Sequence, residues 1–395
     1  NLHKVFNRDF TNSFLKGNLT KDMFIDNPRD NSIKHAVDKS SAISIVQIQD
    51  VKDELYADRN DLGAELREKI KNSSEERTTI SFYQYYNLGN TSLFRDHLFI
   101  MWDALGVLGR TYVAHEGINA QISVPTKKLD AFTKKLSEIT FLDGIRLNKA
   151  IEDDGKSFVK LQIKVRDKIV ADGIEDPTFD PTDKGTHLKA GEFNALTDDE
   201  NTIVVDMRNH YESEVGHFEN AICPDVDTFR EQLPLVAKDL EPMKDKNIVM
   251  YCTGGIRCEK ASAYMRHNGY KNVYQLEGGI IEYARQVKNQ GLENKFKGKN
   301  FVFDDRLAEA ISEEVIANCH QCGEPADTHV NCANTGCNLL FIQCDSCKSK
   351  MEQCCSTTCV DVIHMTEEDQ KQWRKEHRAK KKLFSKGRFD ESITN

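Results

Sequence analysis

The chain has 395 residues, of which 39% are hydrophobic and 30% charged, and its formal net charge is −9. These values are typical of a water-soluble protein of two or three domains and exclude a general attraction to nucleic acid, so a polyanion would need a local basic patch. We expect no membrane protein, because no apolar run reaches the ~20 residues that span a bilayer. Residues 1–4 lead into no apolar stretch, so we expect no signal peptide and a cytoplasmic location.

The N-terminal part of the chain is predicted to hold an extension and one small domain. Residues 1–76 form a polar extension that is partly helical and carries no recognisable chemistry. Residues 77–170 alternate between strand and helix patterns in the order βαββαβ, with the last strand at 158–165, which is the order of a ferredoxin-like sandwich. His115, Glu116 and Asn119 are a candidate polar site, but we favour a solvated hairpin turn at this place.

A second, α/β domain is predicted at 186–292, after a linker at 171–185 that contains Pro177 and Pro181. The continuous apolar run at 202–207 is typical of a strand that is buried on both faces of a sheet. Further strands are expected at 247–251 and 273–276, and helices between and after them. The alternation predicts a small parallel sheet with helices on both faces.

One loop of this domain carries a candidate nucleophile. Cys252 follows the strand at 247–251 and precedes a helix predicted at 259–267. The loop between them contains Thr253, Gly254, Gly255, Ile256, Arg257 and Cys258. Glycines permit a tight cradle of backbone N–H groups, the helix N-terminus adds positive charge, and Arg257 can pair with an anion beside the sulfur. A cysteine in this place should ionise near or below neutral pH.

Three neighbours of Cys252 have two interpretations each. Asp206 and Arg208 end their strand on the same edge of the sheet as the loop, where they either shape the pocket or neutralise one another as an ion pair. Cys258 is either a resolving thiol for Cys252 or, as we favour, a small buried residue in the first turn of the helix.

The segment 293–365 is predicted to bind metal through its cysteines. Its nine cysteines are Cys319, Cys322, Cys332, Cys337, Cys344, Cys347, Cys354, Cys355 and Cys359. Two C-x2-C pairs suit tetrahedral zinc, and nine thiols supply two four-coordinate sites with one thiol left over. The spacing does not distinguish sequential from interleaved pairing, and His320, His329 or His364 could replace a thiolate. A redox or iron–sulfur role is the alternative to zinc. Such zinc would be structural, because the segment has little apolar core of its own.

The tail, residues 366–395, is the basic region of the chain. Between positions 371 and 388 it has nine Lys and Arg residues against one acid, Glu376. We expect this tail to follow RNA phosphates, and a solvated charged helix is the alternative. The candidate contacts are Lys371, Arg374, Lys375, Arg378, Lys380, Lys381 and Lys382.

Several motifs together resemble known families. The six-residue loop from Cys252 to Arg257 is similar to the active-site loop of rhodaneses, and is one residue shorter than that of the related phosphatases. Over residues 75–385 the chain resembles the bacterial tRNA uridine(34) hydroxylases, which contain a rhodanese domain. The motifs that carry this resemblance lie at 77–83, 114–124, 206–212, 216–221, 251–262, 277–283 and 319–359.

The resemblance implies an oxidoreductase that hydroxylates C5 of the wobble uridine in the tRNA anticodon loop, with molecular oxygen as co-substrate and Cys252 as the catalytic residue. We recognise in the sequence no nucleotide or flavin motif and no 2-His-1-carboxylate iron site. The loop by itself favours a sulfurtransferase that carries a persulfide on Cys252. A non-enzymatic RNA-binding protein, acting through the cysteine-rich segment and the tail, is the third interpretation.

Overall fold

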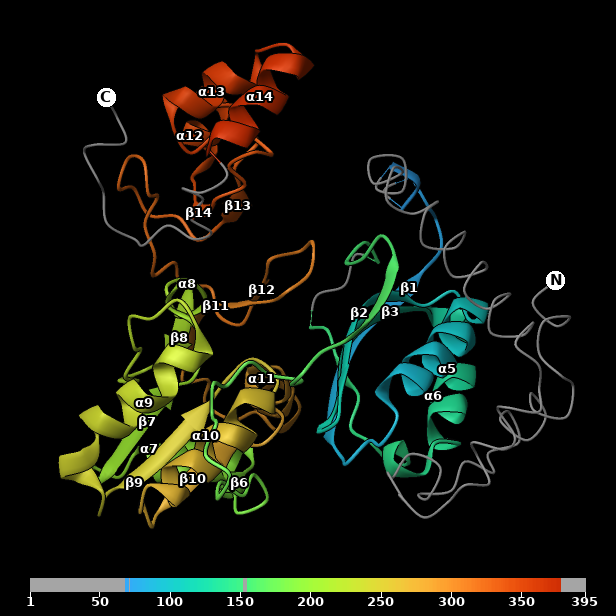
Figure 1. The fold of residues 1–395 in the computed structure, drawn as a ribbon. Helices are drawn as coiled ribbons and strands as arrows, with labels where there is room; N and C mark the ends of the chain where they lie inside the picture. The colour runs from blue at the N-terminus through green and yellow to red at the C-terminus, as the bar shows by residue number, and fades with distance from the viewer. Residues whose placement is uncertain (1–67, 71, 152–154, 378–395) are drawn as a thin grey trace, which may run out of the picture. The chain divides into compact units, whose positions relative to one another are not determined.

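The computed structural model describes residues 68–70, 72–151 and 155–377 (Figure 1). The described residues form two compact units, which divide between Ile169 and Val170. Most of the predicted N-terminal extension and the end of the basic tail lie outside the described residues. Among the helices that the structure describes, none is both long and apolar enough to cross a membrane.

The first unit is a sheet with helices α5 and α6 on one face (Figure 1). Its elements are β1 (Arg77–Tyr85), α5 (Thr91–Ala104), β2 (Leu108–Ala114), β3 (Gly117–Pro125), α6 (Leu129–Ser137), β4 (Asn148–Lys149) and β5 (Leu161–Val165). The five strands lie in the order β4-β1-β3-β2-β5. The first four strands of this order form the ferredoxin-like sheet that the sequence predicts.

The position of the last predicted strand differs from the expectation. The strand expected at 158–165 is β5, and it pairs parallel with β2 at the far edge of the sheet. The fourth ferredoxin-like position, beside β1, is occupied by the two-residue strand β4. Alternating hydrophobicity identifies which face of a strand is buried but not which strand it pairs with. The pattern at 158–165 therefore does not indicate at which edge of the sheet this strand lies.

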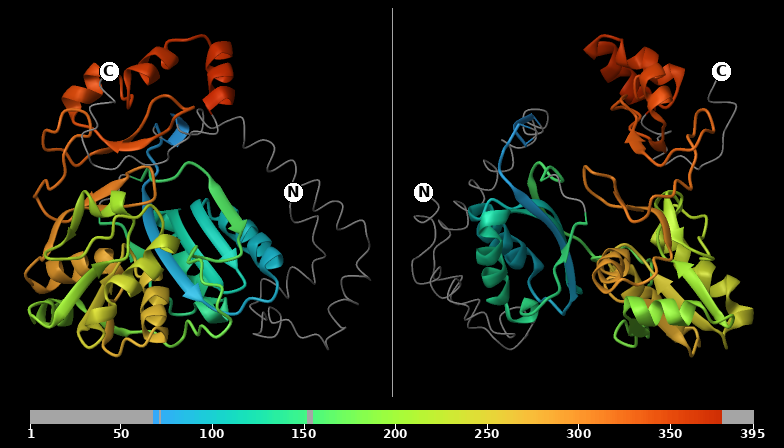
Figure 2. Two further views of the ribbon diagram at one scale, coloured as in Figure 1. Left: turned by 60° about the vertical axis from the view of Figure 1, so that its left-hand side comes forward. Right: turned by 180° about the vertical axis from the view of Figure 1, so that it is seen from behind.

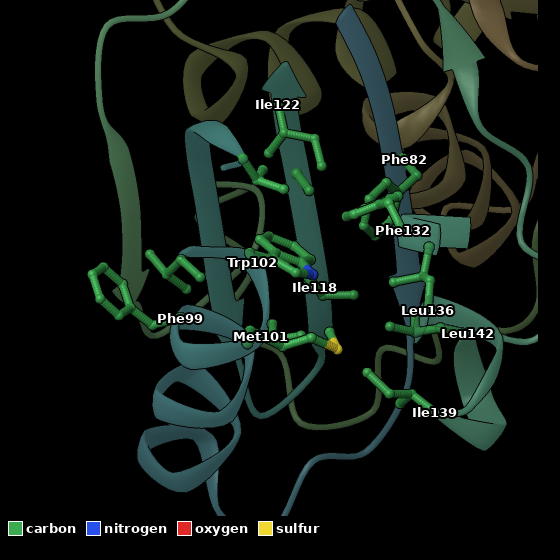
Figure 3. Packing of buried hydrophobic residues seen from close by; sticks show 14 of the residues in the cluster. Phe82, Phe99, Met101, Trp102, Ile118, Ile122, Phe132, Leu136, Ile139 and Leu142 are labelled. Atoms are coloured by element: carbon green, nitrogen blue, oxygen red, sulfur yellow. The ribbon is translucent and has the colours of Figure 1, made fainter. Parts of the chain in front are cut away.

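The core of the first unit lies between the sheet and its two helices (Figure 3). Trp102 of α5 is fully buried and contacts the rings of Phe82 on β1 and Phe132 on α6, with centroid distances of 6.2 and 5.7 Å. Apolar residues on one face of each helix and on every second position of the strands meet here, which is the physical reason for the two-layer arrangement.

The second unit is built on a parallel sheet. Its elements up to residue 290 are β6 (Thr186–Leu188), α7 (Ala190–Thr197), β7 (Thr202–Asp206), α8 (His210–Ser213), β8 (Gly216–Phe218), α9 (Phe229–Asp239), β9 (Asn247–Tyr251), α10 (Ile256–His267), β10 (Val273–Leu276) and α11 (Gly279–Gln290). The sheet order is β6-β10-β9-β7 with every pair parallel. Helices α9 and α10 pack on one face and α7 and α11 on the other, as predicted.

The segment predicted as a linker, 171–185, packs along α10. Asp172 forms a buried ion pair with Lys260. The backbone N–H of Gly185 donates to the hydroxyl of Ser262 at 3.0 Å, and Asp183 pairs with Arg266. The turn-rich sequence of this segment is therefore held against the second unit by polar contacts at several points.

The remaining elements are β11 (Phe296–Phe301), β12 (Ala308–Ala310), β13 (His329–Asn331), β14 (Leu340–Ile342), α12 (Asp345–Lys350), α13 (Thr357–Ile363) and α14 (Glu367–His377). Strand β11 pairs antiparallel with β8, so the chain beyond residue 292 adds to the α/β domain before the cysteine-rich module begins. Figure 2 shows α12, α13 and α14, in red, gathered into one small module with β13 and β14.

Candidate active site

The candidate loop lies at the carboxyl end of the parallel sheet. Strand β9 ends at Tyr251, which pairs with Asp206 at the end of β7. Helix α10 begins at Ile256, three residues earlier than predicted, and Gly255 precedes it with φ of +98°. Since this left-handed conformation favours glycine, the second glycine of the pair is required by the turn. The early start of α10 brings its first N–H groups, which have no partner within the helix, close to Cys252.

Cys252 is fully buried, and its sulfur accepts a hydrogen bond from the N–H of Gly255 at 3.2 Å. Burial raises the pKa of this thiol. The hydrogen bond from the Cys258 thiol, the positive charge of Arg257 and the backbone N–H groups of both residues outweigh burial and bring the pKa from 9.0 to about 6. The loop thus surrounds the sulfur with hydrogen-bond donors, and a thiol with this pKa is mostly a thiolate at neutral pH.

Cys258 supplies one of these hydrogen bonds. It is fully buried, and burial together with the adjacent Cys252 sulfur raises its pKa well above the ordinary value. Its proton is therefore retained and donated to Cys252. This agrees with the favoured interpretation of Cys258 as a small buried residue and gives it a role in stabilising the thiolate.

Arg257 contacts a residue that sequence reasoning missed. Its guanidinium makes two hydrogen bonds with the carboxylate of Glu212, at 2.6 and 2.8 Å, and Glu212 is fully buried. The same carboxylate accepts from the N–H of Asn209 at 3.0 Å and from the Thr253 hydroxyl at 3.4 Å. Glu212 thus holds Arg257 beside the sulfur. The pattern Asn-x-x-Glu, a capping box at the start of α8, is the signal that could have identified it.

The other side of the loop is held by the start of α11. The N–H of Ile280 donates to the carbonyl of Cys252 at 3.0 Å, and the N–H of Ile281 donates to that of Thr253 at 3.2 Å. Gly279 allows this close approach: it has φ of +67°, and a Cβ there would lie 2.5 Å from the Cys252 carbonyl oxygen. The loop therefore directs its N–H groups toward the sulfur and its carbonyls toward α11.

Asp206 and Arg208 form an ion pair beneath the loop. Both side chains are fully buried, and Arg208 makes short hydrogen bonds with the Asp206 carboxylate, the closest at 2.6 Å. Arg208 also donates to the carbonyl of Gly216 at 2.5 Å. Of the two interpretations offered by the sequence, this geometry favours mutual neutralisation, with the pair joining β7 to β8.

The hairpin that joins β2 and β3 has a structural role in the first unit. His115 bonds to the carbonyl of Leu88 through Nδ1 at 2.8 Å. The Glu116 carboxylate accepts from the N–H of Ile169 at 2.7 Å, and the Asn119 amide donates to the Ile169 carbonyl at 3.2 Å. These polar side chains therefore tie the hairpin to the end of the domain.

Eight of the nine C-terminal cysteines gather into two groups of four. The first group is Cys319, Cys322, Cys344 and Cys347, and the second is Cys332, Cys337, Cys355 and Cys359, with the sulfurs of each group within 4.8 Å of one another. The distances between Cys322 and Cys344 (3.6 Å) and between Cys337 and Cys355 (3.7 Å) fit a tetrahedron of four thiolates around zinc, for which Zn–S bonds of ~2.3 Å require about 3.8 Å. The pairing is interleaved along the chain.

The ninth cysteine, Cys354, belongs to neither group. It is fully buried in an apolar cluster with Val330 and Phe341. Its pKa is raised by burial, so it remains a thiol. Its inclusion among the predicted ligands therefore finds no support in the geometry of the described residues.

Three of the predicted RNA contacts, Lys371, Arg374 and Lys375, lie on α14; the other four, Arg378, Lys380, Lys381 and Lys382, are outside the described residues. The first turn of α14 is acidic, with Glu367, Glu368 and Asp369. Arg374 donates to the hydroxyl of Thr335 at 3.2 Å, which attaches the helix to the cysteine-rich module. The positive charge of the residues from Lys371 onward on this helix is thus balanced by the three acids of its first turn.

A parallel α/β sheet with an ionised cysteine in a six-residue cradle defines a rhodanese-type domain. In agreement, residues 189–286 match the family model described as rhodanese-like domain. Residues 77–169 match the UPF0176 acylphosphatase like domain, and residues 297–360 match the rhodanase C-terminal model. A single-domain sulfurtransferase of Saccharomyces cerevisiae, RDL2, is 20% identical and covers 28% of this chain and 98% of its own, with a TM-score of 0.24.

Curated relatives cover a larger share of the chain. This chain is 58% identical over 325 residues to a protein of Pectobacterium carotovorum named tRNA uridine(34) hydroxylase. The matched residues cover 82% of this chain and 92% of the relative. A protein of the same name from Photorhabdus laumondii is 57% identical over the same shares. The chain belongs to the tRNA uridine(34) hydroxylase family.

Proposed function

We propose that the protein is a tRNA-modifying oxidoreductase that hydroxylates uridine 34, the wobble base of the anticodon loop. Family membership at 58% identity over most of the chain supports this function over a sulfurtransferase. The observation that carries the chemistry is the buried thiolate of Cys252 among N–H donors and beside Arg257. We place the reaction in the cytoplasm, where tRNA is used in translation.

In this proposal the Cys252 sulfur, as thiolate or persulfide, adds to C6 of the uracil ring. C6 is the electrophilic end of an enone, so a soft sulfur nucleophile suits it. Addition moves electron density to C5, which then reacts with molecular oxygen. One oxygen atom stays on C5, the other leaves as water with two electrons from an external reductant, and loss of the C5 proton and of sulfur restores the ring. The N–H groups of the cradle stabilise the sulfur anion at the start and end of the cycle.

The remaining parts of the chain have supporting roles. The two groups of four cysteines hold zinc ions that stabilise the C-terminal module, because four thiolates leave no open coordination position for catalysis. The wobble base lies in a single-stranded loop, so it can leave its stack and enter a pocket at modest cost. The basic residues of the tail pair with tRNA phosphates.

Mass spectrometry of nucleosides tests this function. Unmodified tRNA incubated with the protein and a reductant under air should gain one oxygen atom on uridine, and should gain none under nitrogen. The Cys252→Ser variant should bind tRNA and leave it unmodified. A gain of sulfur in place of oxygen would assign the protein to tRNA thiolation, and modification by Cys252→Ser would refute the role of the cysteine.

A further inference from the structure

The sheet of the first unit has a second face, opposite α5 and α6. Because side chains alternate along a strand, residues next to the core positions Ile80, Ile118 and Val113 point to this face. The strand register places Tyr83, Asn119, Tyr112 and Lys164 in one row across β1, β3, β2 and β5. The next row is Ser81, Gln121, Arg110 and Gln162.

This face combines aromatic rings with positive charge. Tyr83 and Tyr112 are half-buried, and Arg110 and Lys164 are exposed. The guanidinium of Arg166 lies over the Tyr112 ring, 5.6 Å from its centroid. Since Tyr83 and Tyr112 are separated by one intervening strand, their backbones lie about 9.6 Å apart, twice the usual strand spacing. Two rings at that distance can each stack on a base of one single-stranded segment.

The charge of this face differs from that of the whole chain. The outward positions of β1, β2, β3 and β5 include Arg110 and Lys164 and no Asp or Glu, whereas the chain has 63 acids against 54 basic residues. The acids next to these strands along the chain are Glu76, Asp167, Glu75, which forms an ion pair with Arg77, and Glu116, whose carboxylate accepts the N–H of Ile169. Local positive charge of this kind is what an acidic protein needs in order to bind a polyanion.

One end of the face is covered by the chain itself. The hydroxyl of Thr79 contacts that of Ser157 at 2.8 Å, and Ser157 is fully buried. Arg77 turns to Ser123, donating to its hydroxyl at 3.0 Å. The connection from β4 to β5 therefore crosses the sheet at the Thr79 end. At the opposite end the Asn119 amide donates to the carbonyl of Ile169 at 3.2 Å, so the chain that follows β5 approaches the first row at β3. The accessible part of the face is thus on β2 and β5, where Tyr112 is half-buried and Arg110 and Lys164 are exposed.

We propose that this sheet face binds single-stranded RNA, namely the anticodon-loop nucleotides that flank the target uridine. The tyrosines stack on bases, and Arg110, Lys164 and Arg166 pair with the phosphates between them. Aromatic rings on an open sheet with basic residues around them are a general solution for single-stranded RNA, because every base has a face that can stack. This inference rests on the proposed function, since it takes tRNA as the substrate.

Fluorescence anisotropy with an RNA hairpin that carries the tRNA anticodon loop tests the proposal. All measurements use full-length protein with Cys252→Ser, so that no turnover occurs. We expect Tyr112→Leu to weaken binding about tenfold through the lost stack. Lys164→Ala should lower the slope of log K against log salt by about 0.7, as for one phosphate contact to a single strand. The matched control is Lys134→Ala, which changes another exposed lysine, on α6 of the same domain. It should leave the affinity and the salt slope unchanged.

The outcomes separate this inference from the proposed function. If the Cys252→Ser protein does not bind the hairpin, tRNA as substrate and the sheet platform are both overturned. If it binds and Lys164→Ala behaves like Lys134→Ala, the RNA lies elsewhere and only the platform is overturned. If these variants change the oligomeric state in size-exclusion chromatography but not the RNA affinity, the face binds protein. That outcome also overturns the platform. Lys164 is exposed, so its substitution keeps the test valid even if Tyr112→Leu fails to fold.

Discussion

At the scale of single residues, the reactivity of Cys252 results from two opposed effects. Burial disfavours the thiolate, while the Cys258 thiol, Arg257 and the backbone N–H groups of the loop favour it and outweigh burial. Arg257 shares its charge with Glu212, so a part of its field is neutralised before it reaches the sulfur. The hydrogen bond from Cys258 is accordingly the largest of the effects that lower the pKa of Cys252.

Ionisation of Cys252 can be measured as thiolate absorbance near 240 nm, taken as the difference between wild-type protein and Cys252→Ser. The midpoint should lie near pH 6, and modification activity should rise with pH through the same value. Cys258→Ala should move the midpoint upward, because it removes the thiol donor. Cys223→Ala is the control: burial raises the pKa of that thiol to about 12, so the midpoint should not move.

The same shift has a consequence for stability. Because the pKa of Cys252 is lower in the folded protein than in the unfolded chain, the unfolded state binds more protons between about pH 6 and pH 9. The contribution of Cys252 to the free energy of unfolding therefore rises with pH across this window and is lost as the pH falls through 6. A midpoint near 9 in the absorbance experiment would contradict both expectations.

At the scale of elements, the loop is positioned by two helix N-termini that act on opposite sides of its backbone. The first turn of α10 faces the sulfur, and the first turn of α11 binds the loop carbonyls of Cys252 and Thr253. Gly279 allows the contact with α11, since a Cβ there would overlap the Cys252 carbonyl oxygen. The loop conformation thus depends on residues 27 or 28 positions away in the chain.

Substitution of Gly279 separates this contact from backbone strain. Gly279→Ala and Gly291→Ala both place alanine at positive φ, +67° and +63°, at the two ends of α11. Because of that strain, the free energy of unfolding of each variant, measured by urea denaturation, should be about 1–2 kcal/mol lower. Only Gly279→Ala also forces the loop to move, because the space around Gly291 is open. We expect a further loss of stability and at least a tenfold loss of tRNA modification for Gly279→Ala alone, and equal activity of the two variants would disprove the contact's role.

At the scale of the whole molecule, the C-terminal module depends on its cysteines because its apolar clusters are small. Each group of four draws two ligands from each of two separated segments, and the segments of the two groups interleave. Loss of one metal site therefore loosens the segments that form the other.

Metal content tests this arrangement. Elemental analysis should find two zinc ions per chain in wild-type protein and at most one in Cys332→Ser, because the latter breaks the second group. Cys354→Ala should retain two, since Cys354 belongs to neither group. A strong chelator should make the module sensitive to protease while the parallel sheet stays resistant. Loss of metal in Cys354→Ala, or two zinc ions in Cys332→Ser, would show that the ligand assignment is wrong.

The sequence by itself determined the features that depend on local order along the chain. Strand and helix periods predicted the parallel sheet with helices on both faces, and the strand-loop-helix pattern around Cys252 predicted an anion cradle. Each of these follows from residues within a few positions of one another, where hydrophobic period, glycine conformation and helix termini act directly.

Only the tertiary structure decided which distant residues meet. Glu212 reaches Arg257 across 45 positions, Gly279 meets the Cys252 carbonyl, and β5 pairs with β2 at one edge of its sheet. The interleaved cysteine groups likewise join segments that the spacing alone could pair in two ways. In each case the sequence shows that a group needs a partner, whereas the choice of partner depends on how the whole chain buries its apolar surface, a non-local property.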